Sequence, residues 1–142
     1  MADVQSIDWP PEVADVVAAE ARRRYPEEAC GLLLGREGRL VSAIAVPNGA
    51  PAEERRTRYL LSPGAYRRAE EQARAEGLEV IGIFHSHPDH PPEPSPTDLA
   101  EAWPEWVYVI VPVPAGEPGA PRAWRLAGDR TQFVAVRLDA PA

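Results

Sequence analysis

The most informative stretch of this sequence is residues 84–98, which read FHSHPDHPPEPSPTD. His85 and His87 come directly after an apolar run, residues 78–84, which has the length and composition of a mostly buried strand. Side chains two apart on a strand point to the same face, so the Cβ atoms of the two histidines should be roughly 6–7 Å apart. Two ligands at about 2.0–2.1 Å from one zinc ion can bridge that distance. The stretch therefore predicts a strand with a pair of metal-binding imidazoles at its end.

Asp98 is a third candidate ligand, eleven residues after His87 and past a proline-rich loop that is long enough to fold back. Two histidines and one carboxylate leave a fourth position for water, which is the arrangement of catalytic rather than structural zinc sites. The same residues also have a structural interpretation. Ser95, Pro96 and Asp98 have the pattern of a capping box at a helix start, and local rules alone favour capping for Asp98.

Other residues have ordinary interpretations when each is taken alone. Glu28 would be a surface glutamate, Cys30 a small buried residue before an apolar run, and His90 a solvated histidine among prolines. An isolated His-x-His pair can also be two ordinary histidines at a strand end. Local patterns therefore leave the structural and the metal-binding interpretations open.

The rest of the chain predicts helices and strands that alternate around this loop. Helices are expected at residues 11–25, from Ser62 to about Glu76, and at 96–103. Strands are expected at residues 29–35, 39–46, 57–61, 78–84, 106–113, 122–127 and 131–138. The shortest of these, 57–61, is expected at an edge. This order indicates a mixed sheet with helices packed on it and leaves the topology open.

Length and charge limit the class of protein. The 142 residues suit one domain, and a net charge of −7 argues against a nucleic-acid binder and against binding to an anionic membrane surface. The N-terminus lacks the pattern of a signal peptide, and no apolar run approaches the roughly 18 residues of a membrane-spanning helix. We therefore expect a cytoplasmic protein that binds neither nucleic acid nor membrane.

Taken together, the motifs resemble those of the JAMM metallopeptidases, also called MPN+ or JAB domains. The pattern of that family is a glutamate, a distant His-x-His-Pro, six residues, a serine, two residues and an aspartate. Here it reads Glu28, then His85-Ser86-His87-Pro88, then Ser95 and Asp98 at the matching spacing. Residues 25–35, YPEEACGLLLG, also resemble the start of bacterial and archaeal members.

The resemblance runs from about residue 11 to 112 and implies a catalytic site with one zinc ion per chain. The implied ligands are His85, His87 and Asp98. The implied general base, acting on the zinc-activated water, is Glu28. Glu28 fits this role better than Glu27, because the family glutamate stands two residues after the proline and three before the glycine.

The resemblance also implies a substrate and a fold. Ser95 would help to stabilise the oxyanion, a role that conflicts with full commitment as an N-cap. The substrate would be a ubiquitin-like protein, of the sulfur-carrier type in prokaryotic members, cleaved at a peptide or isopeptide bond after its C-terminal glycine. Residues 1–142 would form a single α/β domain of the MPN/JAB type. Its sheet would be curved, mixed, mostly antiparallel and flanked by helices, similar to that of cytidine deaminases.

Residues 57–61 are the expected binding site for the substrate tail, and two other functions are considered beside the peptidase. An edge strand at 57–61 would bind the extended tail of the substrate by β-augmentation. The arginines at 55, 56 and 58 would either attract an acidic carrier or be neutralised by the two preceding glutamates. A non-catalytic MPN scaffold for ubiquitin-like proteins is the alternative to an enzyme. A zinc deaminase is excluded because the chain lacks its C-x-x-C signature.

Overall fold

The structure, a computed structural model, describes residues 5–139. Its helices are α1 (Pro11–Arg24), α2 (Pro63–Ala75) and α3 (Pro96–Ala100), with short 3-10 turns η1 (Ala52–Glu54) and η2 (Pro114–Gly116). Its strands are β1 (Ser6–Asp8), β2 (Cys30–Arg36), β3 (Arg39–Val46), β4 (Glu79–Pro88), β5 (Val107–Val113), β6 (Arg122–Leu126) and β7 (Phe133–Asp139). Within the described residues, no helix is both long and apolar enough to cross a membrane.

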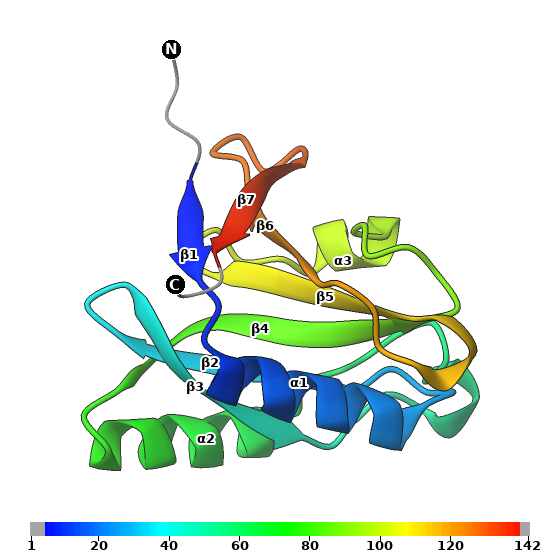
Figure 1. The fold of residues 1–142 in the computed structure, drawn as a ribbon, viewed down its shortest axis with the longest axis horizontal. Coiled ribbons are helices and arrows are strands. Elements are labelled where there is room, and N and C mark those ends of the chain that lie inside the picture. Colours follow the sequence, from blue (N-terminus) through cyan, green and yellow to red (C-terminus); the bar gives the residue numbers. More distant parts are fainter. Residues whose placement is uncertain (1–4, 140–142) are drawn as a thin grey trace.

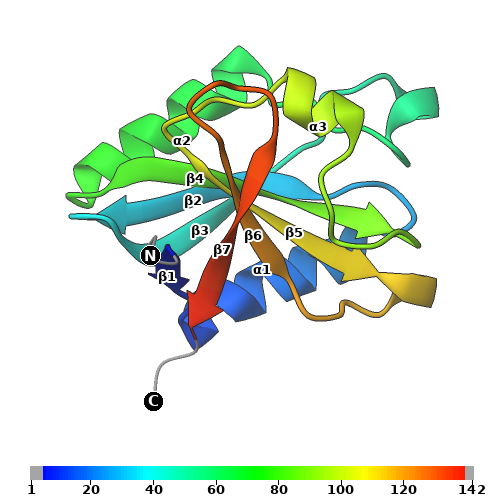
Figure 2. The ribbon, with the colours of Figure 1, turned by 90° about the horizontal axis from the view of Figure 1, so that it is seen from above.

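The strands form one seven-stranded sheet in the order β1-β7-β6-β5-β4-β2-β3. Two neighbouring pairs, β4 with β5 and β1 with β7, are parallel, and the other pairs are antiparallel. The sheet is curled, with α1 on one face and both α2 and α3 on the opposite face (Figures 1 and 2). The predicted fold class, a curved and mostly antiparallel mixed sheet flanked by helices, is confirmed.

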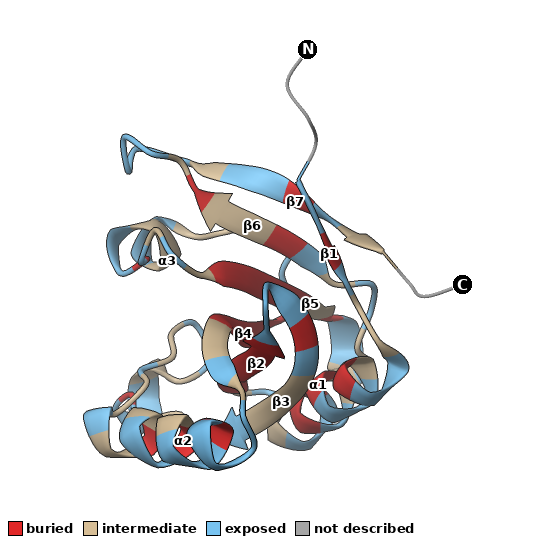
Figure 3. Ribbon diagram, turned by 90° about the vertical axis from the view of Figure 1, so that its left-hand side faces the viewer, coloured by how far each residue is buried: buried red, intermediate tan, exposed pale blue. Residues whose placement is uncertain are grey.

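The centre of the sheet is buried from both sides (Figure 3). Leu32, Leu33 and Leu34 on strand β2 are all fully buried, so this strand reads as a continuous apolar run rather than an alternating one. Leu33 belongs to the same apolar cluster as Val17 of α1, whereas Leu32 and Leu34 cluster with Ala69 of α2. Burying each such leucine contributes roughly 1.5–3 kcal/mol, and this packing fixes α1 and α2 against opposite faces of the sheet.

Strand β4 is longer than the predicted 78–84 and contains both histidines, because its pairing with β5 continues as far as Pro88. It lies in the middle of the sheet, between β2 and β5. A side chain at Gly82 would collide with the carbonyl oxygen of Val107 on β5, so glycine is required for this close approach. The histidines are therefore held on a central, doubly paired strand.

Two other predictions about the elements are corrected, and one strand was missed. Residues 57–61 do not form a strand: Leu60 N donates to the side-chain Oδ1 of Asn48, and Leu60 O accepts from Gly49 N. The segment is extended, but its partner is a loop rather than a strand. Helix α3 is shorter than predicted. Strand β1 was not predicted, because a three-residue strand with one buried side chain, Ile7, has too little pattern to detect.

Candidate metal centre

Three side chains that the sequence singles out meet at one point beside β4. Nε2 of His85 lies 3.2 Å from Nε2 of His87 and 3.3 Å from Oδ2 of Asp98. Nε2 of His87 lies 3.2 Å from the same oxygen. Ligand atoms placed tetrahedrally at about 2.0–2.1 Å from one zinc ion are about 3.3 Å apart. These three atoms, the donor triangle, therefore have the spacing of three corners of a zinc coordination sphere.

The hydrogen bonding of His87 also favours a cation within the donor triangle. Its Nδ1 lies 2.8 Å from the carbonyl oxygen of Pro91, and because a carbonyl oxygen only accepts, Nδ1 carries the proton. A neutral His87 then presents the lone pair of Nε2 toward the carboxylate oxygen of Asp98. A lone pair facing a carboxylate oxygen at this distance is repulsive unless a proton or a metal ion lies between them.

Burial makes a metal ion a better occupant than additional protons. His85 is 1% exposed, and burial lowers the pKa of its imidazole, although Asp98 opposes this shift. Burial alone would raise the pKa of Asp98, but its polar contacts with the imidazoles of His85 and His87 hold that pKa well below its usual range. The site thus favours a neutral His85 beside an ionised Asp98, which is the protonation state of these two groups that binds zinc.

Asp98 reaches the donor triangle from the first turn of α3. Asp98 N donates to Ser95 Oγ at 3.0 Å, and Ser95 N donates to Asp98 Oδ2 at 2.8 Å. This is the capping box that local rules favour. The same Oδ2 faces both imidazoles, so the capping bond fixes the carboxylate in its place in the donor triangle. The structural and the metal-binding interpretations of Asp98 are therefore compatible.

Ser95 is an N-cap, as the local pattern predicts, but the expected conflict with an oxyanion role is wrong. Its cap bond uses only a lone pair of Oγ. A hydroxyl has one donor hydrogen and two acceptor lone pairs, so the O–H hydrogen remains available to a substrate oxygen. The oxyanion role of Ser95 stays a prediction.

Glu28 lies just before β2, and extending the register of β2 and β4 places it across from His87. In the register of β2 and β4, Cys30 is opposite His85. The pairing continues one residue further, because Ser86 N donates to Ala29 O at 3.0 Å and Ala29 N donates to Ser86 Oγ at 2.7 Å. Residues that face each other across antiparallel strands share one face of the sheet, so Glu28 falls on the face of the donor triangle.

The carboxyl group of Glu28 is buried and poorly satisfied. The residue is 4% exposed, and Oε1 has no hydrogen-bond partner among residues 5–139. Burial, together with the nearby Asp98 carboxylate, raises the pKa of Glu28 to about 9. A buried carboxyl group of this kind is a candidate proton carrier beside the donor triangle.

Cys30 and His90 lie as their ordinary interpretations predict. Cys30 is fully buried in a small apolar cluster, and His90 is exposed in the loop that follows β4. Among residues 5–139, the donor triangle is the only group of three or more His, Cys, Asp or Glu side chains close enough together to hold a metal ion. The roles of its members as ligands stay predictions.

Tyr59 contacts the site directly, a role that no sequence motif indicates. Its ring stacks on His85, with ring centroids 4.5 Å apart and an angle of 26° between the planes. In the described part of the chain, Nδ1 of His85 has no hydrogen-bond partner. The stack therefore helps to orient this imidazole, together with the contacts of its Nε2 with His87 and Asp98. No local pattern identifies Tyr59, because it comes from a loop distant in sequence.

Comparison with known proteins decides the family. Residues 10–127 match the family described as prokaryotic homologs of the JAB domain. The chain belongs to this family. The match spans every residue of the donor triangle and Glu28, and it confirms the resemblance that the sequence motifs indicate.

Named relatives of this JAB-domain chain are enzymes. It is 38% identical over 115 residues to a desampylase from Pyrococcus furiosus, an alignment that covers 78% of this chain and 74% of the relative. It is 36% identical over 107 residues to a CysO-cysteine peptidase from Mycobacterium tuberculosis, covering 70% and 68%. A JAB1/MPN domain protein from Archaeoglobus fulgidus shares the fold, with a TM-score of 0.59 at 17% identity and coverage of 93% and 97%. The prediction of a hydrolase is confirmed.

An open groove begins beside the donor triangle of this JAB-domain chain. Its volume is about 1020 Å³, and Tyr59, which stacks on His85, forms part of its wall. Ile83, two residues before His85 on the same face of β4, also lines it. Aromatic side chains extend the groove away from the site: Tyr66, Trp103 and Trp106. A mostly apolar groove that opens next to the donor triangle suits an extended peptide chain.

Proposed function

We propose that this JAB-domain chain is a zinc peptidase that hydrolyses the peptide or isopeptide bond after the C-terminal glycine of a ubiquitin-like protein. In this proposal residues 1–142 act as one catalytic domain that binds one zinc ion. The observation that carries the proposal is the donor triangle, with its spacing of 3.2–3.3 Å, beside the buried carboxyl group of Glu28.

When bound, zinc supplies Lewis acidity, which polarises a carbonyl group and acidifies water. The residues of the chain hold the ion and keep its ligands oriented. His87 is fixed by the bond from its Nδ1 to the Pro91 carbonyl, His85 by the stack on Tyr59, and Asp98 by the capping box. Outer contacts of this kind set the orientation and the basicity of metal ligands.

Glu28 acts as the proton acceptor. In the metal-free chain burial raises its pKa to about 9, which keeps the carboxyl group protonated near pH 7. A divalent cation in the donor triangle favours the carboxylate by Coulomb attraction, so Glu28 becomes a competent base only in the metal-loaded protein. It then takes a proton from the attacking water and passes it to the leaving amine. The Ser95 hydroxyl donates to the oxyanion.

Two observations support an extended glycine-ended tail as the substrate. Relatives are named desampylase and CysO-cysteine peptidase, which supports a ubiquitin-like substrate. In the segment beside the groove, Arg58 O and both backbone groups of Leu60 bond to residues 48–49. The backbone groups of Tyr59 and Leu61 have no partner in the described part of the chain, so they offer a ladder to a strand-like tail. Glycine at its end lets the backbone approach the metal closely.

Attraction of an acidic carrier by the arginines of this segment is not part of the proposal. The guanidinium of Arg58 lies 3.3 Å from Glu54 and 2.9 Å from Glu101. Nε of Arg55 donates to Ala50 O at 2.8 Å. Neutralisation by a preceding glutamate, the other interpretation of the sequence, therefore holds for Arg58.

The test is a fusion of a β-grasp sulfur-carrier protein, ending in Gly-Gly, to a short peptide, with the products read by intact mass. The zinc-loaded wild type should cleave after the terminal glycine. The zinc-stripped protein should not cleave, and the Glu28→Gln variant should cleave about 10²- to 10⁴-fold more slowly than the wild type. Changing the last glycine to valine should slow cleavage sharply, because a side chain there prevents the close approach of the backbone.

Three outcomes of this test would contradict parts of the proposal. Cleavage by the zinc-stripped protein would contradict the metal mechanism. Indifference to the glycine-to-valine change, or equal cleavage of unfolded casein, would indicate a general peptidase. Zinc binding and carrier binding without turnover would support the non-catalytic scaffold instead.

A further inference from the structure

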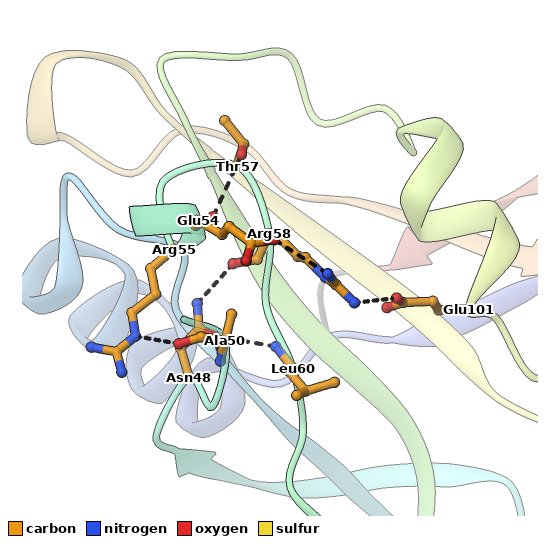
Figure 4. A network of polar contacts seen from close by, with 8 residues as sticks. All are labelled: Asn48, Ala50, Glu54, Arg55, Thr57, Arg58, Leu60 and Glu101. Carbon is orange, nitrogen blue, oxygen red and sulfur yellow. Dashed lines mark hydrogen bonds and ion pairs between the residues drawn. The ribbon is translucent and has the colours of Figure 1, made fainter. Parts of the chain in front are cut away.

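The side chain of Asn48 has all of its hydrogen-bonding groups in use, and Figure 4 shows its contacts with Arg58 and Leu60. Its Nδ2 donates to the carbonyl oxygens of Glu28, at 3.1 Å, and of Arg58, at 2.9 Å. Its Oδ1 accepts from the N–H groups of Ala50, at 2.9 Å, and of Leu60, at 3.1 Å. An amide side chain offers two donor hydrogens and two acceptor lone pairs, so this network is complete.

The network holds the backbone of Glu28, which lies between α1 and β2 and belongs to neither a helix nor a strand. Glu28 N donates to Arg55 O at 2.7 Å, and Glu28 O accepts from Asn48. Both backbone groups of the proposed base are thus held by one loop, residues 48–60. The position of the carboxyl group depends on the shape of that loop.

The same loop contacts the elements that carry the donor triangle. Asn48 binds the backbone on either side of Tyr59, whose ring stacks on His85. Next to it, the guanidinium of Arg58 lies 2.9 Å from Glu101 at the end of α3 (Figure 4). One loop therefore touches the base, one imidazole donor and the helix of the carboxylate donor.

We propose that Asn48 is a positioning residue that aligns the carboxyl group of Glu28 with the donor triangle. This inference rests on the proposed function and goes beyond it. Because the amide of Asn48 is saturated by bonds within the protein, it has no group left for a substrate or a metal. Its effect is on alignment, and a displacement of about 1 Å at a catalytic group can lower a rate by about 100-fold.

The test compares two variants of Asn48 with a control in the same loop. Asn48→Ala removes all four hydrogen bonds, whereas Asn48→Asp keeps the acceptor bonds and removes both donor bonds. Thr57→Ala is the control, since Thr57 is exposed and its hydroxyl reaches only Glu54 O at 3.5 Å. All proteins are loaded with zinc, checked for folding by circular dichroism and assayed on the carrier fusion. Both Asn48 variants should lose about 10- to 100-fold in kcat with KM changed less than about twofold, and Thr57→Ala should match the wild type.

Two further measurements separate alignment from a merely structural role. In a Glu28→Gln background, Asn48→Ala should lower kcat by less than about threefold, because no carboxylate remains to be aligned. Cobalt substitution gives a readout independent of turnover. Asn48→Ala should shift the visible absorption bands of bound cobalt through the contact of Tyr59 with His85, and Thr57→Ala should leave them unchanged.

Wild-type kcat in the Asn48 variants, or equal losses in both backgrounds, would overturn the positioning role. If Asn48→Ala does not fold, Asn48→Asp decides by the same criteria. A wild-type chain that binds zinc without turning over would overturn the proposed function, so the two failures are distinguishable. In that case the cobalt spectrum decides the positioning role, and unchanged bands in the folded Asn48 variants overturn it.

Discussion

Replacing Glu28 by glutamine should stabilise the metal-free chain at pH 8, although the same change should lower turnover by about 10²- to 10⁴-fold. Burial, with a contribution from Asp98, raises the pKa of Glu28 from 4.5 to about 9. In the unfolded chain the carboxyl group ionises near pH 4.5, whereas in the folded metal-free chain it keeps its proton until about pH 9. The stability contributed by this group is therefore fully present below pH 4.5 and is lost as the pH rises toward 9.

The magnitude follows from the size of the pKa shift of Glu28. One pKa unit corresponds to about 1.36 kcal/mol, so this group should remove about 4 kcal/mol from the free energy of unfolding between pH 5 and pH 8. That loss is a large part of the roughly 5–15 kcal/mol that stabilises a typical domain. Glutamine cannot ionise, so the free energy of unfolding of Glu28→Gln should not fall in this way between pH 5 and pH 8. Other titrating groups act in both proteins, so the difference between the two profiles isolates Glu28.

Urea unfolding in the presence of a chelator, at intervals of one pH unit from 5 to 8, measures the effect. The gap between Glu28→Gln and the wild type should widen steadily with pH, and Glu27→Gln should follow the wild type. Saturating zinc should make the free energy of unfolding of the wild type depend less on pH, because the cation favours the ionised form of Glu28. Parallel profiles for the wild type and Glu28→Gln without metal would refute the reasoning that burial holds this carboxyl group protonated.

Three other predictions concern the ligand, the base and the oxyanion donor. Asp98→Ala should lose zinc and turnover together, as measured by elemental analysis and intact mass, whereas full zinc occupancy would show that Asp98 only caps α3. Glu28→Gln should keep zinc and fold but lose about 10²- to 10⁴-fold in turnover, while Glu27→Gln should be mild; the opposite result would mean that the motif register is wrong. Ser95→Ala should lower kcat and also reduce the free energy of unfolding by about 1 kcal/mol through loss of the cap. A normal kcat in that variant would leave Ser95 with the capping role alone.

The sequence predicts the elements of the fold well wherever a local pattern and the tertiary structure agree. The apolar run at 39–46 coincides with β3, and Ser62 caps α2 by accepting from Ala65 N at 3.2 Å, as its place before a proline indicates. Residues 57–61 show where such a pattern is insufficient. Tyr59 and Leu61 pack against the core on either side of the exposed Leu60, as in a strand, but side-chain and loop bonds take the place of a sheet ladder. A sequence pattern reports the extended shape of a segment and not its partner.

The composition of the candidate site could be predicted from the sequence, but its alignment could not. His85, His87 and Asp98 are linked by a linear motif, and the structure brings their donor atoms together. The contacts of Asn48 and Tyr59 join segments far apart in sequence, so no local spacing indicates them. Motifs specify which groups a reaction needs, whereas the residues that hold those groups in register become visible only in the folded chain.

Anomalous diffraction at the zinc absorption edge, from crystals grown with zinc, tests the proposed centre most directly. We predict one peak per chain, at about 2.0–2.1 Å from Nε2 of His85, Nε2 of His87 and Oδ2 of Asp98. A zinc-saturated crystal with no peak within the donor triangle, or with its strongest peak elsewhere on the chain, would contradict the assignment of this site as a catalytic zinc centre.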